Sequence, residues 1–122
     1  MFDYDIFEIG NTSIGTSSGT LGKDNSSTKL TVPSYYRMKT KWLDIYNTGT
    51  TTAFVTLQKS NGTNTYTLIY KNLAASGSPG DALIFDERHP FTVEPGYWLQ
   101  ANVSVGSASI FAEAELIPEQ AG

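Results

Sequence analysis

The sequence predicts an all-β protein, a single jelly-roll-like antiparallel β-sandwich with an extended N-terminal arm. No stretch of the 122 residues repeats apolar side chains at the 3.6-residue period of an amphipathic helix. From Thr28 onward, eight short segments of alternating character are separated by turns rich in Gly, Pro, Asn and Ser, which is typical of β-sandwiches and barrels. An immunoglobulin-like sandwich is the alternative, although the chain contains no cysteine to form the pair found in antibody domains.

Composition divides the chain into three parts. Residues 1–27 are expected to form an N-terminal strand or arm and a flexible linker, residues 28–117 the sandwich body, and residues 118–122 a C-terminal tail. Between Gly10 and Thr28 nearly every residue is Gly, Ser, Thr or Asn. Such a segment buries too little apolar surface to offset the entropy lost when it becomes ordered, so a linker is expected.

The start of the arm is apolar. Its candidate docking residues are Phe2, Tyr4, Ile6, Phe7 and Ile9. Burying each large apolar side chain is worth roughly 1.5–3 kcal/mol, so these residues are costly to leave in water. Two interpretations follow: the segment adds a strand to a sheet edge of a partner or neighbouring subunit, or it pairs within its own sandwich as an ordinary first strand.

The body is organised around residues 35–58, which are expected to form two long strands joined as a hairpin by the polar turn 47–50. The period of two in this segment marks strands with one face on a core and one face on water or a partner. The row expected to face the core comprises Leu43, Ile45, Ala53, Val55 and Leu57.

The other strands follow from the same alternation and from turn residues. A short strand is expected at 29–32, stopped by Pro33. Later strands are expected at 65–71, 83–85, 91–93, 97–105 and 109–117, the last two joined as a hairpin. Residues 61–64 and 94–96 are predicted turns, the second with Pro95 presetting φ and Gly96 free to adopt a positive φ. Tyr66, Leu68 and Tyr70 alternate with polar residues and are expected to share one face.

Aromatic side chains indicate a candidate interaction face. It consists of Tyr36, Met38, Trp42, Tyr46, Tyr97 and Trp98. The first four lie on the face opposite Leu43 and Ile45, so they point outward if those two residues face the core. An exposed aromatic row is either a subunit interface or a ligand platform. A β-bulge near Trp42 would instead turn some of the row inward and leave Arg37, Lys39 and Lys41 as the outward row.

Several function classes find no support in the sequence. Cysteine is absent and the single histidine lies in Asp86-Glu87-Arg88-His89, expected to be a solvated loop, so no metal, cofactor or catalytic site is predicted and the chain is not expected to be an enzyme. The net charge of −4 without a Lys/Arg cluster argues against nucleic acid. No apolar run has the length of a membrane span, and Asp3 and Asp5 stand where a signal peptide carries positive charge.

The body also resembles a known family over roughly residues 30–117. The segments that carry the resemblance are Val32-Pro33, Trp42-Leu43-Asp44-Ile45-Tyr46-Asn47-Thr48-Gly49, Ala53-Phe54-Val55-Thr56-Leu57, and Phe91 to Ala101. They resemble small β-sandwich structural proteins of tailed bacteriophages, most of all head decoration (cement) proteins. The resemblance implies a non-enzymatic virion protein, made in the bacterial host cytoplasm, that sits on the capsid surface as a homotrimer bound to the major capsid protein. A tail or baseplate protein and a carbohydrate-binding module remain the alternatives.

Overall fold

The computed structural model describes residues 6–24, 26, 28–85 and 91–118. All regular structure in these residues is β. The strands are β1 (Ile6–Ile14), β2 (Gly19–Thr20), β3 (Gly22–Lys23), β4 (Tyr36–Asn47), β5 (Ala53–Ser60), β6 (Thr65–Leu73), β7 (Ala82–Phe85), β8 (Thr92–Val93), β9 (Trp98–Val103) and β10 (Ala108–Pro118).

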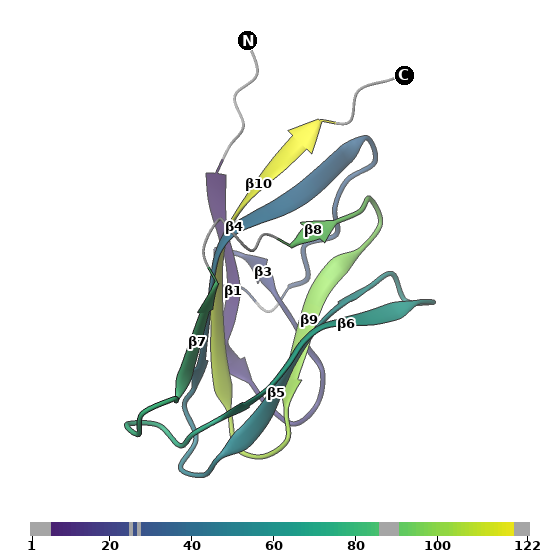
Figure 1. Ribbon diagram of the computed structural model, residues 1–122. Coiled ribbons are helices and arrows are strands. Elements are labelled where there is room, and N and C mark those ends of the chain that lie inside the picture. The colour runs from purple at the N-terminus through teal and green to yellow at the C-terminus, as the bar shows by residue number, and fades with distance from the viewer. Residues whose placement is uncertain (1–5, 25, 27, 86–90, 119–122) are drawn as a thin grey trace.

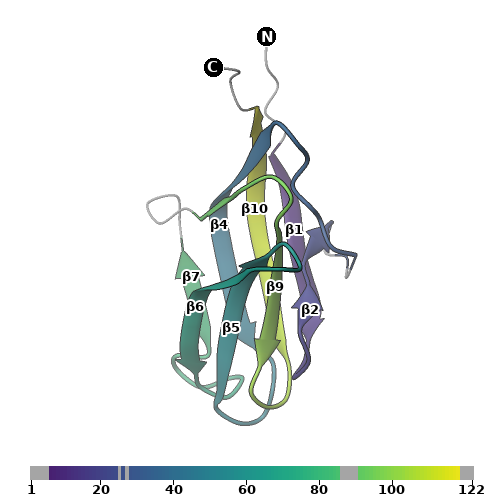
Figure 2. The same cartoon turned by 90° about the vertical axis from the view of Figure 1, so that its right-hand side faces the viewer.

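The strands form two antiparallel sheets that face each other (Figure 1). Sheet A has the order β3-β1-β10-β4-β7, and β8 also pairs with β4; sheet B has the order β2-β9-β5-β6. Figure 2 shows β6, β5 and β9 of sheet B in front of sheet A. The chain crosses between the sheets after β1, β2, β4, β6, β8 and β9, which is the connectivity of a jelly roll. The predicted fold class is therefore confirmed.

The hydrophobic core lies between the sheets and follows the period of two. Leu43 and Ile45 of β4 are at most 1% exposed, as are Val55 and Leu57 of β5. Burial of each such side chain contributes about 1.5–3 kcal/mol. The inward row of β10 is fully buried and mostly small; it consists of Ala108, Ile110, Ala112 and Ala114.

The central segment contains the two expected strands, but the expected hairpin between them is wrong. β4 pairs with β10, β7 and β8 in sheet A, whereas β5 pairs with β6 and β9 in sheet B. The turn after Asn47 therefore crosses from one sheet to the other. A crossing of this kind places the two apolar rows face to face across the core, whereas a hairpin would place them side by side.

The predicted final hairpin is a second crossing, because β9 belongs to sheet B and β10 to sheet A. A true hairpin joins β5 and β6 across the predicted turn at 61–64. There the Asn61 N–H donates to the Asn64 carbonyl over 3.1 Å. The predicted turn at 94–96 is also present: the Tyr97 N–H donates to the Glu94 carbonyl over 3.2 Å, and Gly96 has a φ of 85°.

The segment expected to be a flexible linker forms strands in the described residues. β1 continues to Ile14, and β2 and β3 follow it. Ile9, Ile14 and Leu21 are fully buried, so a few widely spaced apolar side chains anchor the polar chain between them. Gly22 serves close packing, because a Cβ there would overlap the carbonyl oxygens of Ser26 and Thr28.

Residues 29–32 are not a strand, although they are held in place. Val32 is 1% exposed and its N–H donates to the Tyr97 carbonyl over 2.9 Å. The body therefore does not begin at residue 28, since β1, β2 and β3 belong to the same sandwich.

Candidate interaction surfaces

The described part of the chain contains no arrangement of three or more His, Cys, Asp or Glu side chains that could hold a metal ion. The loop 86–89, weighed above as a possible catalytic or metal site, lies outside the described residues. The described residues contain no helix long and apolar enough to cross a membrane. The features that remain are the outer faces of the two sheets.

The expected aromatic row on β4 is split by a β-bulge. The β4–β10 register shifts between Glu113 and Ala114, because Glu113 lies opposite Trp42 whereas Ala114 lies opposite Thr40. The extra residue, Lys41, reverses the alternation. Met38 is consequently fully buried and does not belong to an interaction face, which corrects the expectation for this residue.

Trp42 and Tyr46 keep the outward orientation beyond the bulge. Trp42 is 39% exposed, and the Tyr46 hydroxyl lies 2.7 Å from the Ser76 hydroxyl. Tyr36, at the start of β4, is 38% exposed and lies opposite Pro118 at the end of β10. Before the bulge the outward positions are occupied by Arg37 and Lys39, as the bulge interpretation predicts.

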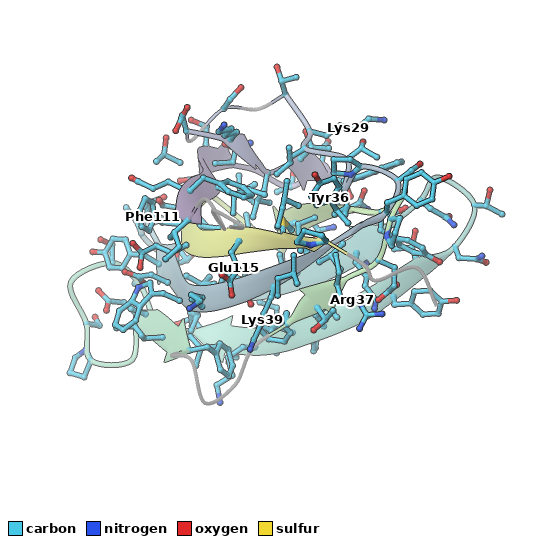
Figure 3. The ribbon with its side chains drawn as sticks, turned by 90° about the horizontal axis from the view of Figure 1, so that it is seen from above. Lys29, Tyr36, Arg37, Lys39, Phe111 and Glu115 are labelled. Atoms are coloured by element: carbon cyan, nitrogen blue, oxygen red, sulfur yellow. The ribbon has the colours of Figure 1, made fainter. Side chains whose placement is uncertain are left out.

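Large apolar side chains cluster on the outer face of sheet A. We call this set the sheet A patch; it consists of Trp42, Tyr46, Ile84 and Phe111, which lie around Asp44. Phe111 lies opposite Asp44 on β4, which in turn lies opposite Ile84 on β7. Ile84 is 54% exposed. Ile6 on β1 is 57% exposed, but Glu113 and Glu115 of β10 separate it from this patch. Figure 3 shows Phe111 together with Glu115 of the same strand.

Charged residues surround this patch. Lys39 lies opposite Glu115, whose carboxylate is 3.7 Å from the Lys41 ammonium group (Figure 3). Glu8 lies directly opposite Glu113, and neither forms an ion pair with another described residue. The outer face of sheet A is therefore a mixed apolar and charged surface.

Tyr97 and Trp98 do not form one patch, because Tyr97 precedes β9 and packs against the core whereas Trp98 begins β9. Tyr97 packs against the core and lies 6.3 Å from the Tyr66 ring, centroid to centroid. Trp98 is on the outer face of sheet B, where the Lys29 ammonium group lies 3.9 Å from its ring centroid. The Trp98 indole N–H donates to the Gln100 side-chain oxygen over 3.0 Å.

Sequence reasoning missed a stacked pair on sheet B. The rings of Phe54 and Tyr70 are 4.9 Å apart and nearly parallel, at 7°, with 40% and 64% of each residue exposed. The β5–β6 register shifts between Leu57 and Gln58, so Tyr66 and Tyr70 do not share the face expected of them. The spacing of Phe54 and Tyr70 indicates their proximity only when this register is known.

The candidate docking residues of the arm divide into two groups. Phe2 and Tyr4 lie outside the described residues. Ile6, Phe7 and Ile9 lie on β1, which pairs with β10 from Ile6 to Ile14. Ile9 is fully buried, Phe7 packs against the core and Ile6 is exposed. This part of the arm is a strand of the protomer's own sheet, which was the second interpretation of the segment.

Comparisons with known proteins assign no family to the chain. No family model matches the sequence, and no curated protein sequence matches it. Two similar solved structures are both described as a pentameric capsid protein isolated from metagenomic phage sequences. Each is 14% identical, with TM-scores of 0.47 and 0.46. The aligned region covers 93% of this chain, and the chain spans 63% of the length of each.

Proposed function

We propose that this chain is a non-enzymatic structural protein of a bacteriophage virion, a capsid decoration (cement) protein that binds the outer head surface as a homotrimer and stabilises it. The sequence resemblance supports the virion assignment. Its segments occupy structural positions in the jelly roll: Leu43 and Ile45 lie in the core, and the turn at 94–96 leads into β9. The proposal includes the major capsid protein as the partner.

The observation that carries the proposal is the sheet A patch. Trp42 and Ile84 are 39% and 54% exposed on one sheet face. Contiguous exposed apolar patches mark interaction sites, and symmetric oligomers bury such patches at their interfaces. Charged residues around the patch, among them Lys39 and Glu115, resemble the polar rim of an interface.

A decoration protein also needs a contact with the capsid. Phe2 and Tyr4 precede β1 in the sequence, and the exposed Ile6 begins that strand. We assign the capsid contact to this end of the chain, with strand addition as its mode, because alternate apolar side chains suit that type of binding. From Ile6 onward the arm is strand β1, which pairs with β10 of the same protomer.

Self-association is tested by light scattering across a dilution series. We expect a trimer that Trp42→Asp converts to a folded monomer, since a carboxylate buried at an interface lacks a partner. Thr56→Asp, an outward position of the central strand β5 in sheet B, is the matched control and leaves the trimer intact. A monomer at every concentration contradicts the proposal.

Capsid binding is tested by cosedimentation with heads assembled from the major capsid protein of the same genome. The expected result is saturable pelleting with heads and none with purified tails. Pelleting with tails alone supports the tail or baseplate alternative and overturns the head assignment.

A further inference from the structure

The outer face of sheet B differs in chemistry from that of sheet A. Its central strands present Thr56 and Gln58 from β5, and Gln100 and Asn102 from β9. These four residues form two cross-strand pairs, Thr56 with Asn102 and Gln58 with Gln100. All four are half-buried and none is charged, whereas the outer face of sheet A carries carboxylates and ammonium groups.

Part of the polar surface is already organised by hydrogen bonds. The Gln100 side-chain nitrogen donates to the Gln58 side-chain oxygen over 3.1 Å, and the Gln100 oxygen accepts from Trp98. Among the described residues, the Asn102 amide, the Thr56 hydroxyl and the Gln58 side-chain nitrogen have no side-chain hydrogen bond. These groups offer both donors and acceptors to a ligand on this face.

The stacked aromatic pair borders the same row. Tyr70 lies directly opposite Thr56, and Phe54 is two residues from Thr56 along β5. Because both rings are well exposed, they provide an apolar surface beside the amides. Strands lie about 4.8 Å apart, so the three strands β6, β5 and β9 span roughly 10 Å.

We infer that the outer face of sheet B binds a neutral oligosaccharide. A sugar ring has an apolar face of C–H groups, which suits Phe54 and Tyr70, and hydroxyls that both donate and accept, which suit the amides. The four residues of the row are uncharged, and the Lys29 ammonium group on this face is held over the Trp98 ring. This arrangement disfavours an anionic ligand, because phosphate or carboxylate recognition requires basic side chains that face the ligand. Two exposed rings among several amides also supply less apolar surface than the core of a protein–protein interface requires.

Affinity electrophoresis of the full chain tests this inference, with dextran, mannan and galactan as neutral probes and dextran sulfate as the charged probe. We expect retardation by at least one neutral probe and none by dextran sulfate. Tyr70→Ala and Gln58→Ala should each weaken binding by roughly tenfold. Tyr35→Ala is the matched control and should bind as the parent does, because Tyr35 is an exposed aromatic residue that lies outside both sheets.

Thermal melts followed by circular dichroism establish that each variant is folded. If Tyr70→Ala is unfolded, Tyr70→Phe replaces it as the test variant. The Phe variant keeps the stacked ring and should retain most of the affinity. Retardation by none of the neutral probes, binding to dextran sulfate alone, or equal loss in Tyr35→Ala would overturn the inference. A change of oligomeric mass in Tyr70→Ala would assign the face to subunit contact and would overturn it as well.

Discussion

Asn47 stabilises the crossing between the two sheets. It is fully buried, and its side-chain nitrogen donates to the carbonyls of Thr51 and Ala74, each over 2.9 Å. Its side-chain oxygen accepts the Gly49 N–H over 2.8 Å. One amide therefore satisfies the backbone of two loops that lie far apart in the sequence.

Asn47→Ala leaves these buried groups without partners and should lower the free energy of unfolding by about 3 kcal/mol. Asn61→Ala is the matched control, because Asn61 also accepts backbone N–H groups, from Thr63 and Asn64, but in an exposed turn. Water replaces those bonds, so we expect a loss below about 1 kcal/mol. Urea titration measures both, and equal losses would show that burial is not the cause.

Glu8 and Glu113 place like charges directly opposite each other on β1 and β10. Cross-strand pairs contribute roughly 0.2–1 kcal/mol, and a like-charged pair is unfavourable. Glu113→Thr should therefore raise the free energy of unfolding by that amount at low salt, with a smaller gain at high salt because of screening. Glu115→Thr, which loses the contact with Lys41, should give no gain. A gain that persists unchanged in 1 M salt would contradict an electrostatic origin.

At the scale of elements, β1 joins the arm to the sandwich. It contributes Ile9 and Ile14 to the core and pairs with β10. Deletion of residues 1–27 removes this strand together with Leu21 and leaves an inner strand of sheet A as an edge. We therefore expect the truncated chain to fail to fold or to melt far below the full chain.

Deletion of residues 1–5 is the matched control, because it leaves β1 complete. We expect an unchanged melting temperature together with loss of cosedimentation with heads. Calorimetry and the pelleting assay measure the two effects separately. Full head binding without residues 1–5 would remove the capsid contact from the N-terminal end.

The same elements show how far sequence reasoning extends. Alternation identified β4, β5, β9 and β10, and it identified Leu43, Ile45, Ala53, Val55 and Leu57 as inward residues, because a period of two depends on one strand alone. It did not identify the partner of each strand, since a hairpin and a crossing between sheets have the same local pattern. The start of β1 was one of the two interpretations of the arm, whereas its continuation to Ile14, β2 and β3 were missed. Two buried side chains, Ile14 and Leu21, hold a segment whose other residues are mostly small and polar.

The candidate interaction residues show the same limit: alternation within one strand predicted some of their orientations, and the pairing between strands decided the others. The orientation of Trp42 and Tyr46 was predicted, but Met38 was assigned to the wrong face because a single inserted residue, Lys41, reverses the alternation. A bulge is a property of two paired strands and has no fixed signature in one of them. The Phe54–Tyr70 pair was missed for the same reason.

At the scale of the whole molecule, the first and last strands lie side by side. β1 pairs with β10, so sheet A is complete only when the end of the chain is in place. The two sheets also share one core, since Leu43 of sheet A and Leu57 of sheet B are both 1% exposed. Neither sheet can keep its apolar face buried without the other, and we expect one cooperative unfolding transition.

The two tryptophans allow a direct measurement, because Trp42 lies on sheet A and Trp98 on sheet B. In Trp98→Phe the remaining fluorescence reports sheet A, and in Trp42→Phe it reports sheet B. Within each variant, the urea midpoint from tryptophan fluorescence should coincide with the midpoint from far-ultraviolet circular dichroism, with a slope of about 1–3 kcal/mol per M. The two midpoints should coincide because a shared core cannot open on one side alone. If the fluorescence midpoint lies below the circular dichroism midpoint in only one of the two variants, the sheets unfold separately and the prediction is wrong.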